Sequence, residues 1–512
     1  MSQSANNKRI AKNTLLLYVR MLLMMAVNLY TSRVILQVLG VEDYGIYNVV
    51  GGVVALFGVI SGSLSTSTQR FITYEIGKSD YNNLSRVFSI SMYIHIAMCI
   101  MILLLAETLG VWFLNNQMQI PEGRTTATMW VYQCAVISSI IMIMSVPYNA
   151  TIIAHEKMSV FAIISLLEAF LKLAIVYLLS IFDIDKLLLY AILLVIVQLI
   201  IRFCYTYYCN KNFSETKIIM VKDFSLAKEI GMFSLWSLFG NVAYVSYTQG
   251  LNVLLNLFFT PTINAARAIA IQVQSAINQF VSNFQMALNP QITKSYAAGN
   301  LLFMQSLVFR SARFSFYMLL ILSLPILIEA DKILYLWLTI VPEYTPTFLR
   351  LILLTTWVNS IANPLIVSVK ATGHVKQYEC IVGVIMLLIL PISYVFLYLG
   401  YPPYVVFVVH LIMEFIAQFA RIMITRKLIG FSICEFCKHV ISRIMLVTAI
   451  AIILPCVLNL VLSKSLFSFF IICISSVLSC FMSIYLLGMT DGERQIIISK
   501  GKQFLSKYKS FI

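Results

Sequence analysis

Charged residues inside long apolar stretches are the part of this sequence that could bind a ligand. Six are basic and two are acidic: Arg20, Arg33, Lys172, Arg202, Arg267, Arg350, Glu168 and Glu414. A charge at the centre of a bilayer costs roughly 2.5–3.5 kcal/mol on insertion scales, so each needs a partner or a wet cavity. Basic residues in a partly dry cavity favour an anion, and arginine suits phosphate because its guanidinium donates two parallel hydrogen bonds.

The position of each charge within its stretch separates the candidates. Three arginines lie within about two helical turns of an end and can extend to the membrane interface, namely Arg33, Arg202 and Arg350. Arg20 and Arg267 lie deeper, and Lys172 is near the middle of its stretch. Glu168 precedes Lys172 by four residues, so the two share a helix face; a structural pair and a substrate or ion site are equally open. Glu168 and Glu414 are therefore the candidates for ion coupling.

Polar residues continue these charges along whole helix faces. Three stripes recur at helical spacing: Arg267, Gln274, Asn278, Ser282, Gln285 and Asn289; then Ser234, Ser237, Asn241, Tyr244, Thr248 and Asn252; then Asn13, Arg20, Asn28 and Thr31. Polar residues also join helices in lipid, but one or two per helix suffice for that. We therefore predict a water-lined face, and a substrate site of Arg20, Arg267, Lys172, Asn28, Asn241, Gln274 and Asn278.

Almost the whole chain consists of the apolar elements that must position these residues. It has 512 residues, of which 60% are hydrophobic and 11% charged, with a mean hydropathy of +0.89. A helix needs about 20 apolar residues to cross the hydrocarbon core. Helices are the expected spanning element, because lipid offers no hydrogen-bond partner for an unpaired backbone group. The predicted spans are 14–38, 45–66, 87–110, 125–149, 158–181, 187–208, 230–257, 262–289, 306–328, 346–369, 379–399, 403–425, 440–461 and 466–488. The expected fold class is an all-α integral membrane protein with 14 transmembrane helices.

Lysine and arginine set the orientation of these spans. With the N-terminus inside, 26 of the 36 basic residues fall in cytoplasmic segments and four fall outside. The positive-inside rule then places both termini in the cytoplasm of a multi-pass protein. The net charge of +15 is explained by anionic lipid head groups, so we expect no nucleic-acid partner.

Short internal matches indicate a repeat. They pair Pro147 with Pro364 and Ala154 with Ala371 at a shift of 217, and Gln69 with Gln291, Tyr74 with Tyr296 and Gly77 with Gly299 at a shift of 222. An even number of spans per repeat gives two parallel six-helix lobes around a central cavity, which is a transporter architecture. The predicted domains are residues 1–210, 211–430 and 431–512, the last being a C-terminal helix pair with a basic tail.

No pattern in the sequence calls for a metal or a cofactor. Cys434 and Cys437 form a lone C-x-x-C pair, which is a weak metal signal without a second pair. The five histidines show no ligand spacing. We therefore expect neither a metal site nor a cofactor.

Two short segments of the chain resemble a known family. The segment from Leu39 to Tyr47 reads L-G-V-E-D-Y-G-I-Y and is similar to the L-G-x-x-x-Y-G-x-Y signature of Wzx-type polysaccharide flippases, as is the run of Ala154, Glu156 and Lys157. These flippases belong to the multidrug/oligosaccharidyl-lipid/polysaccharide exporter superfamily. The resemblance implies a MATE-like, non-enzymatic transporter of the bacterial inner membrane that translocates an undecaprenyl-pyrophosphate-linked oligosaccharide by alternating access. Arg20, Arg267 and Lys172 would hold the pyrophosphate or acidic sugars.

The resemblance also bears on partners. The substrate would be the O-antigen, capsule or exopolysaccharide repeat unit on its membrane lipid. The polymerase and glycosyltransferases of polysaccharide biosynthesis are the expected partners, and the protein itself is expected to be a monomer.

Three other functions are alternatives to this one. An ion-coupled multidrug exporter of the same superfamily is the main alternative; such exporters carry a buried acidic residue early in one lobe, whereas span 14–38 has Arg20 and no acid. A sugar polymerase or ligase would want a large outer loop with catalytic groups, and the longest offers only Glu329, Asp331, Lys332 and Glu343. A non-transporting scaffold would not need polar stripes in both halves.

Overall fold

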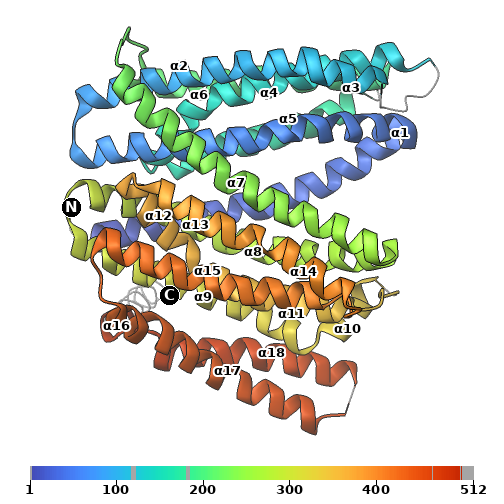
Figure 1. The fold of residues 1–512 in the computed structure, drawn as a ribbon, viewed down its shortest axis with the longest axis vertical. Coiled ribbons are helices and arrows are strands. Elements are labelled where there is room, and N and C mark those ends of the chain that lie inside the picture. The colour runs from blue at the N-terminus through green and yellow to red at the C-terminus, as the bar shows by residue number, and fades with distance from the viewer. Residues whose placement is uncertain are drawn as a thin grey trace, which may run out of the picture. The chain divides into compact units, whose positions relative to one another are not determined.

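The protein is described by a computed structural model that covers residues 3–116, 123–179, 181, 185–338, 340–463, 465–495 and 498. Within these ranges every regular element is helical (Figure 1). The elements are α1 Gln3–Lys78, α2 Tyr81–Leu105, η1 Ala106–Gly110, α3 Val111–Asn116, α4 Thr125–Ala154, α5 Met158–Leu178, α6 Lys186–Asn212, η2 Ser214–Thr216, α7 Phe224–Phe258, α8 Pro261–Ala297, α9 Leu301–Ile328, α10 Ala330–Leu338, α11 Thr345–Ser360, α12 Ala362–Thr372, α13 Val375–Leu387, α14 Ile389–Tyr398, α15 Val405–Ile429, α16 Ile433–Phe436, η3 Cys437–Ile441, α17 Ser442–Val461, α18 Leu466–Ser483 and η4 Ile484–Gly488.

The predicted all-α membrane class is confirmed. Among the described residues, ten helices are long and apolar enough to cross a membrane, or eleven if the bent pair Glu42–Gly52 and Phe57–Lys78 counts as one span. Helices α7 and α8 are long, at 35 and 37 residues, but are not among these ten. Both carry the predicted polar stripes, which lower their hydropathy. The count of fourteen spans therefore stays a prediction.

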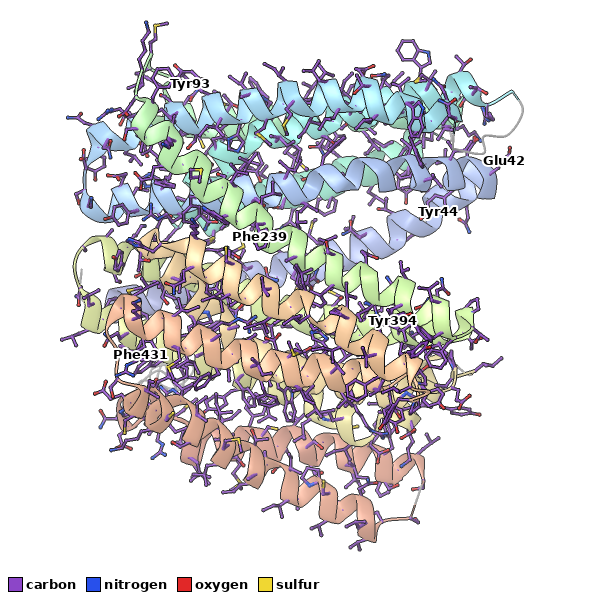
Figure 2. The ribbon with its side chains drawn as sticks, viewed as in Figure 1. Glu42, Tyr44, Tyr93, Phe239, Tyr394 and Phe431 are labelled. Atoms are coloured by element: carbon purple, nitrogen blue, oxygen red, sulfur yellow. The ribbon has the colours of Figure 1, made fainter. Side chains whose placement is uncertain are left out.

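Helix α1 contains the first two predicted spans in one element of 76 residues. Gly40 interrupts it with φ 77 and ψ 172, a conformation that glycine adopts without a Cβ clash. Glu42 and Tyr44 follow directly on this bend (Figure 2). The glycine of the L-G motif is thus the point at which the chain changes direction between the two spans.

Two compact units divide the described chain. The first contains residues 1–243, 286–301 and 370–380, and the second contains residues 244–285, 302–369 and 381–512. The predicted division at residues 210 and 430 stays a prediction. The ends of α8 and α12 thus pack with the first unit although most of each helix belongs to the second.

In the first unit, α1, α4, α5 and α6 pack around a common apolar core. Phe88 of α2 meets Tyr148 of α4 edge to face, with ring centroids 5.4 Å apart. At one end Arg124, just before α4, forms ion pairs with Asp43 of α1 and with Asp185, whose carboxylate caps α6. This three-way contact fixes the bend of α1 and the starts of α4 and α6 against each other.

The second unit ends in an antiparallel pair of helices, α17 and α18 (Figure 1). The Ser479 hydroxyl donates a hydrogen bond to the Ala451 carbonyl at 3.0 Å and joins the two. Ser465 begins α18 with a capping box, in which its side chain and the Ser468 side chain each bond the other's backbone. Elsewhere in this unit, Phe348 of α11 packs on Phe407 of α15 at 4.5 Å.

Candidate functional site

Arg267 of α8 is held by the neighbouring helix α7. Its guanidinium donates one hydrogen bond to the Asn252 side-chain oxygen and another, at 2.8 Å, to the Thr248 carbonyl. The turn from Phe258 to Pro261 is short, which brings these facing residues together. The residue is 6% exposed, and its Nε has no hydrogen-bond partner among the described residues. A fixed arginine with one unsatisfied donor is suited to binding an anion.

Aromatic residues of α7 and α15 lie near this arginine. Tyr244 and Tyr247 of α7 pack edge to face at 5.4 Å, and Tyr247 meets the ring of His410 on α15 at 5.3 Å. Tyr247 is buried, whereas Tyr244 is exposed. Two residues of the predicted stripe on α7, Thr248 and Asn252, therefore position the arginine of α8.

Glu414 of α15 is not an isolated carboxylate. It is 2% exposed and forms an ion pair with Arg421, two turns further along the same helix, at 2.5 Å. Gln418, between them, is also buried, and its Nε2 has no partner among the described residues. The charge pattern of the sequence places Arg421 in a cytoplasmic segment and so does not reveal this pair. The seven-residue spacing with Gln418 midway is the signal that could have revealed it.

In the first unit, Arg20 lies over the ring of Phe161, with its guanidinium carbon 4.4 Å from the centroid. This is a cation–π contact, and it joins α1 to α5. The side chain is half-buried, and its buried Nε–H has no hydrogen-bond acceptor among the described residues. Arg20 therefore shares with Arg267 a buried Nε donor that has no acceptor among the described residues.

Glu168 and Lys172 form the ion pair that their spacing predicts, at 2.7 Å. Gln198 of α6 also donates to the Glu168 carboxylate at 3.2 Å. The bond from Gln198 connects α5 with α6, and each of the two partly exposed charges has a polar partner. Substrate binding by Lys172 and ion coupling by Glu168 stay predictions.

The predicted amides fall into two groups. Asn241 donates to the Ser63 hydroxyl and Gln274 donates to the Thr356 hydroxyl, each at 2.8 Å. Both therefore join helices, as polar residues commonly do in lipid. Asn28 is exposed and Asn278 is half-buried. The first unit contains Arg20, Asn28, Lys172 and Asn241, and the second contains Arg267, Gln274 and Asn278.

Comparison of the sequence with protein-family profiles and with curated proteins finds no match. Comparison of the structure finds transporters. One is an outward-facing multidrug resistance MATE family transporter of the MOP superfamily, with a TM-score of 0.71 and 13% identity over 83% of this chain and 96% of that chain. Another is the Vibrio cholerae MATE transporter VcmN in its bent form, with a TM-score of 0.69 and 16% identity over 83% and 98%. A MATE structure in the bent conformation gives a TM-score of 0.70 and 13% identity over 83% and 96%. The chain therefore has the MATE fold.

Proposed function

We propose that this protein is a transporter of the bacterial inner membrane that moves an undecaprenyl-pyrophosphate-linked oligosaccharide to the outer leaflet by alternating access. The MATE fold of the structural neighbours supports a transporter. The resemblance of the Leu39–Tyr47 segment to the flippase signature supports the lipid-linked sugar. Both termini are cytoplasmic in this proposal. The polymerase and glycosyltransferases of the pathway act next to it.

The observation that carries the proposal is Arg267. Two of its N–H groups are fixed by α7, and its buried Nε has no acceptor among the described residues. A pyrophosphate oxygen supplies the missing acceptor in a charge-assisted hydrogen bond worth about 1.5–3 kcal/mol. Because α7 already fixes the guanidinium, little side-chain entropy is lost on binding. Arg20 offers the same kind of donor from the first unit.

A second candidate function is an ion-coupled multidrug exporter. The structural neighbours favour it equally, since one of them is a multidrug resistance transporter. Glu414 supplies the buried carboxylate that such coupling needs. Its pairing with Arg421 counts against cation binding, because the carboxylate charge is already neutralised.

The proposed function is tested in cells that lack the gene but make the lipid-linked sugar. The protein should restore surface polysaccharide, and Arg267→Ala should abolish this without loss of protein from the membrane. Arg267→Lys should restore only part of the export, because the charge stays but the planar fork is lost. Arg350→Ala is the matched control, since that arginine pairs with the exposed Asp331 at the end of its helix. Normal export by Arg267→Ala would refute the proposal, and drug efflux without export would select the second candidate.

A further inference from the structure

The ends of four helices carry a polar cluster that the proposed function does not use. It comprises Arg70 near the end of α1, Glu156 just after α4, and Gln291 and Lys294 near the end of α8; we call these the latch residues. They contact one another or the end of α12. All of them, and residues 370–373, lie in the first compact unit. By the charge bias of the sequence this is the cytoplasmic end of the spans.

Glu156 and α8 form the first half of the cluster. The Glu156 carboxylate is 1% exposed and accepts hydrogen bonds from Lys294 at 2.7 Å and from Gln291 at 2.6 Å. The backbone carbonyl of Glu156 accepts a further hydrogen bond from the Asn13 side chain at 3.2 Å. A carboxylate this buried is stable only while its partners stay, because an unpaired buried charge is costly.

Arg70 and α12 form the second half. The Nε of Arg70 donates to the carbonyl of Lys370 at 3.1 Å, and its Nη2 donates to the carbonyl of Ala371 at 3.0 Å. These carbonyls belong to the last turn of α12, which ends at Thr372, so no following helical turn donates to them; the Lys370 carbonyl also accepts from the Gly373 N–H at 3.1 Å. A cation at this end also complements the helix dipole. The guanidinium carbon also lies 4.4 Å from the ring centroid of Phe71 and 4.7 Å from that of Tyr74.

The two halves occupy equivalent places in the predicted repeat. The shift of 217 residues that pairs Ala154 with Ala371 maps Glu156 onto Gly373. Both residues have positive φ, 59° and 85°, as the residue that follows a helix end. A Cβ on Gly373 would meet Arg70 Nη2 at 2.9 Å. The arginine thus fills the space beside Gly373 that a side chain would otherwise need.

The repeat also brings a matched pair into direct contact. Tyr74 and Tyr296, related by the shift of 222, pack with ring centroids 6.3 Å apart. Gly77 lies against Lys294 and Ala297 so closely that a Cβ would be 2.7 Å from that of Ala297. In a two-fold arrangement, only residues close to the axis can meet their own counterparts. The latch residues therefore cluster around a local pseudo-two-fold contact.

Helix α8 has a built-in weak point beside the latch. Pro290 lies inside the helix, one turn before Lys294, and has no N–H to donate to the preceding turn. A helix bends most readily at such a position. The end of α8 can therefore move with Gln291 and Lys294 without breaking a backbone hydrogen bond at that residue.

We propose that the latch residues hold this end of the protein closed and that their separation opens it to the cytoplasmic leaflet. The inference rests on the proposed function as an alternating-access transporter. One half is an ion pair between Glu156 and Lys294, and the other is a clamp by Arg70 on the last carbonyls of α12. The joined segments are 138 and 300 residues apart in the chain, so only tertiary contacts hold them.

The test is the accessibility of a buried position next to the latch. Ser67 lies one turn before Arg70, is fully buried, and donates to the Ile230 carbonyl at 3.3 Å. Ser67→Cys is made in the full-length protein with the exposed Cys434 and Cys437 replaced by Ser. A membrane-impermeant thiol reagent is then applied to inside-out vesicles. The same protein with Ser67 retained gives the background from the remaining cysteines.

We expect slow labelling of Ser67→Cys, rising about tenfold or more with Glu156→Gln or Arg70→Gln, because each removes charge-assisted hydrogen bonds that favour the closed state. The charge exchange Glu156→Lys with Lys294→Glu should return labelling toward the original rate. Unchanged labelling in both single variants would overturn the proposal, as would an exchange variant that labels as fast as Glu156→Gln. No substrate is present, so a latch that responds while export fails counts against the proposed function alone.

Discussion

Arg313 of α9 and Glu493, 180 residues later in the chain, form a buried ion pair at 2.8 Å. The guanidinium also donates to the Gly488 carbonyl at 3.0 Å, and Arg310 lies 3.3 Å from the same carboxylate. The two side chains are 4% and 8% exposed. This contact fixes the segment after α18 against the middle of the chain.

The first prediction follows from this pair. Glu493→Gln should destabilise the protein by about 3–5 kcal/mol, because it leaves a buried guanidinium uncompensated. Asp491→Asn is the control: its carboxylate is 92% exposed and its pair with Arg494 should be worth close to nothing. Thermal unfolding of both purified variants in detergent measures the difference. Equal melting temperatures would show that the pair does not stabilise the fold.

The second prediction concerns Gly373. Gly373→Ala should destabilise more than Gly400→Ala, although both glycines have nearly the same φ, 85° and 84°. The Cβ at residue 373 meets Arg70 at 2.9 Å, whereas the Cβ at residue 400 meets nothing within 4 Å. The common part of the loss is the backbone cost of a positive φ, about 1 kcal/mol. Any excess, read from thermal unfolding, reports the displacement of Arg70, and its absence would place Arg70 elsewhere.

The third prediction concerns the charge near Arg267. Asn252→Asp keeps an oxygen acceptor for the guanidinium but adds a negative charge to it. The folded yield should stay close to that of the unmodified protein, while export of the lipid-linked sugar falls sharply, because the arginine is neutralised before it meets an anionic head group. Export per molecule of membrane protein is the quantity to compare. Full export by Asn252→Asp would mean that Arg267 does not bind the anion.

The fourth prediction concerns pH. Burial raises the pKa of the Glu215 carboxyl, but the hydrogen bond from His155 at 2.5 Å and a backbone N–H outweigh this and leave the pKa below its usual value of 4.5. A lowered folded pKa adds stability above the unfolded pKa, and this stability is lost as the pH falls through the folded value.

The melting temperature of the unmodified protein should therefore fall as the pH drops from about 6 to below 4.5. The melting temperature of Glu215→Gln should fall less over the same interval. The stacking of His155 on Phe213 at 4.2 Å is retained in this variant. Identical pH dependence of the two proteins would exclude Glu215 as the titrating group.

The fifth prediction concerns topology. A reporter fused after Asp491 should be active only if it works in the cytoplasm, because basic residues concentrate in the segments assigned to that side. A reporter in the loop at Arg124 should behave in the opposite way. An outside location for the first fusion would reverse the orientation and, with it, the side on which the latch residues lie.

The sequence predicts the class of fold well because lipid leaves so few choices. Long apolar stretches must be helices, and the structure confirms this for the described residues. The polar stripes predicted on α7 and α8 fall on residues whose contacts differ. Arg267 keeps an unsatisfied donor, whereas Asn241 and Gln274 bond to Ser63 and Thr356 on other helices. The spacing of residues along a helix shows which of them share a face, but not which other helix that face contacts.

The contacts that the sequence could not give are those between distant segments. Glu156 and Lys294 each read as ordinary loop or helix-end charges, and nothing in one sequence pairs residues 138 positions apart. Arg70 is harder still, because its acceptors are backbone carbonyls, which every residue has. The internal repeat is the one hint, since it aligns Glu156 with Gly373 and predicts that both lie at the ends of equivalent helices.

The different chemistry of the two latch halves has a consequence for how mutation acts on them. The half at Glu156 depends on two side chains, so a change at either codon can break the pair. The half at Arg70 depends on one, because the carbonyls of residues 370 and 371 persist whatever side chains those codons encode. The clamp itself therefore constrains only Arg70 and the room left by Gly373, while the opposite half must vary in a correlated way. Among distant homologues, Arg70 should stand alone as an invariant position, and residues 156 and 294 should change together.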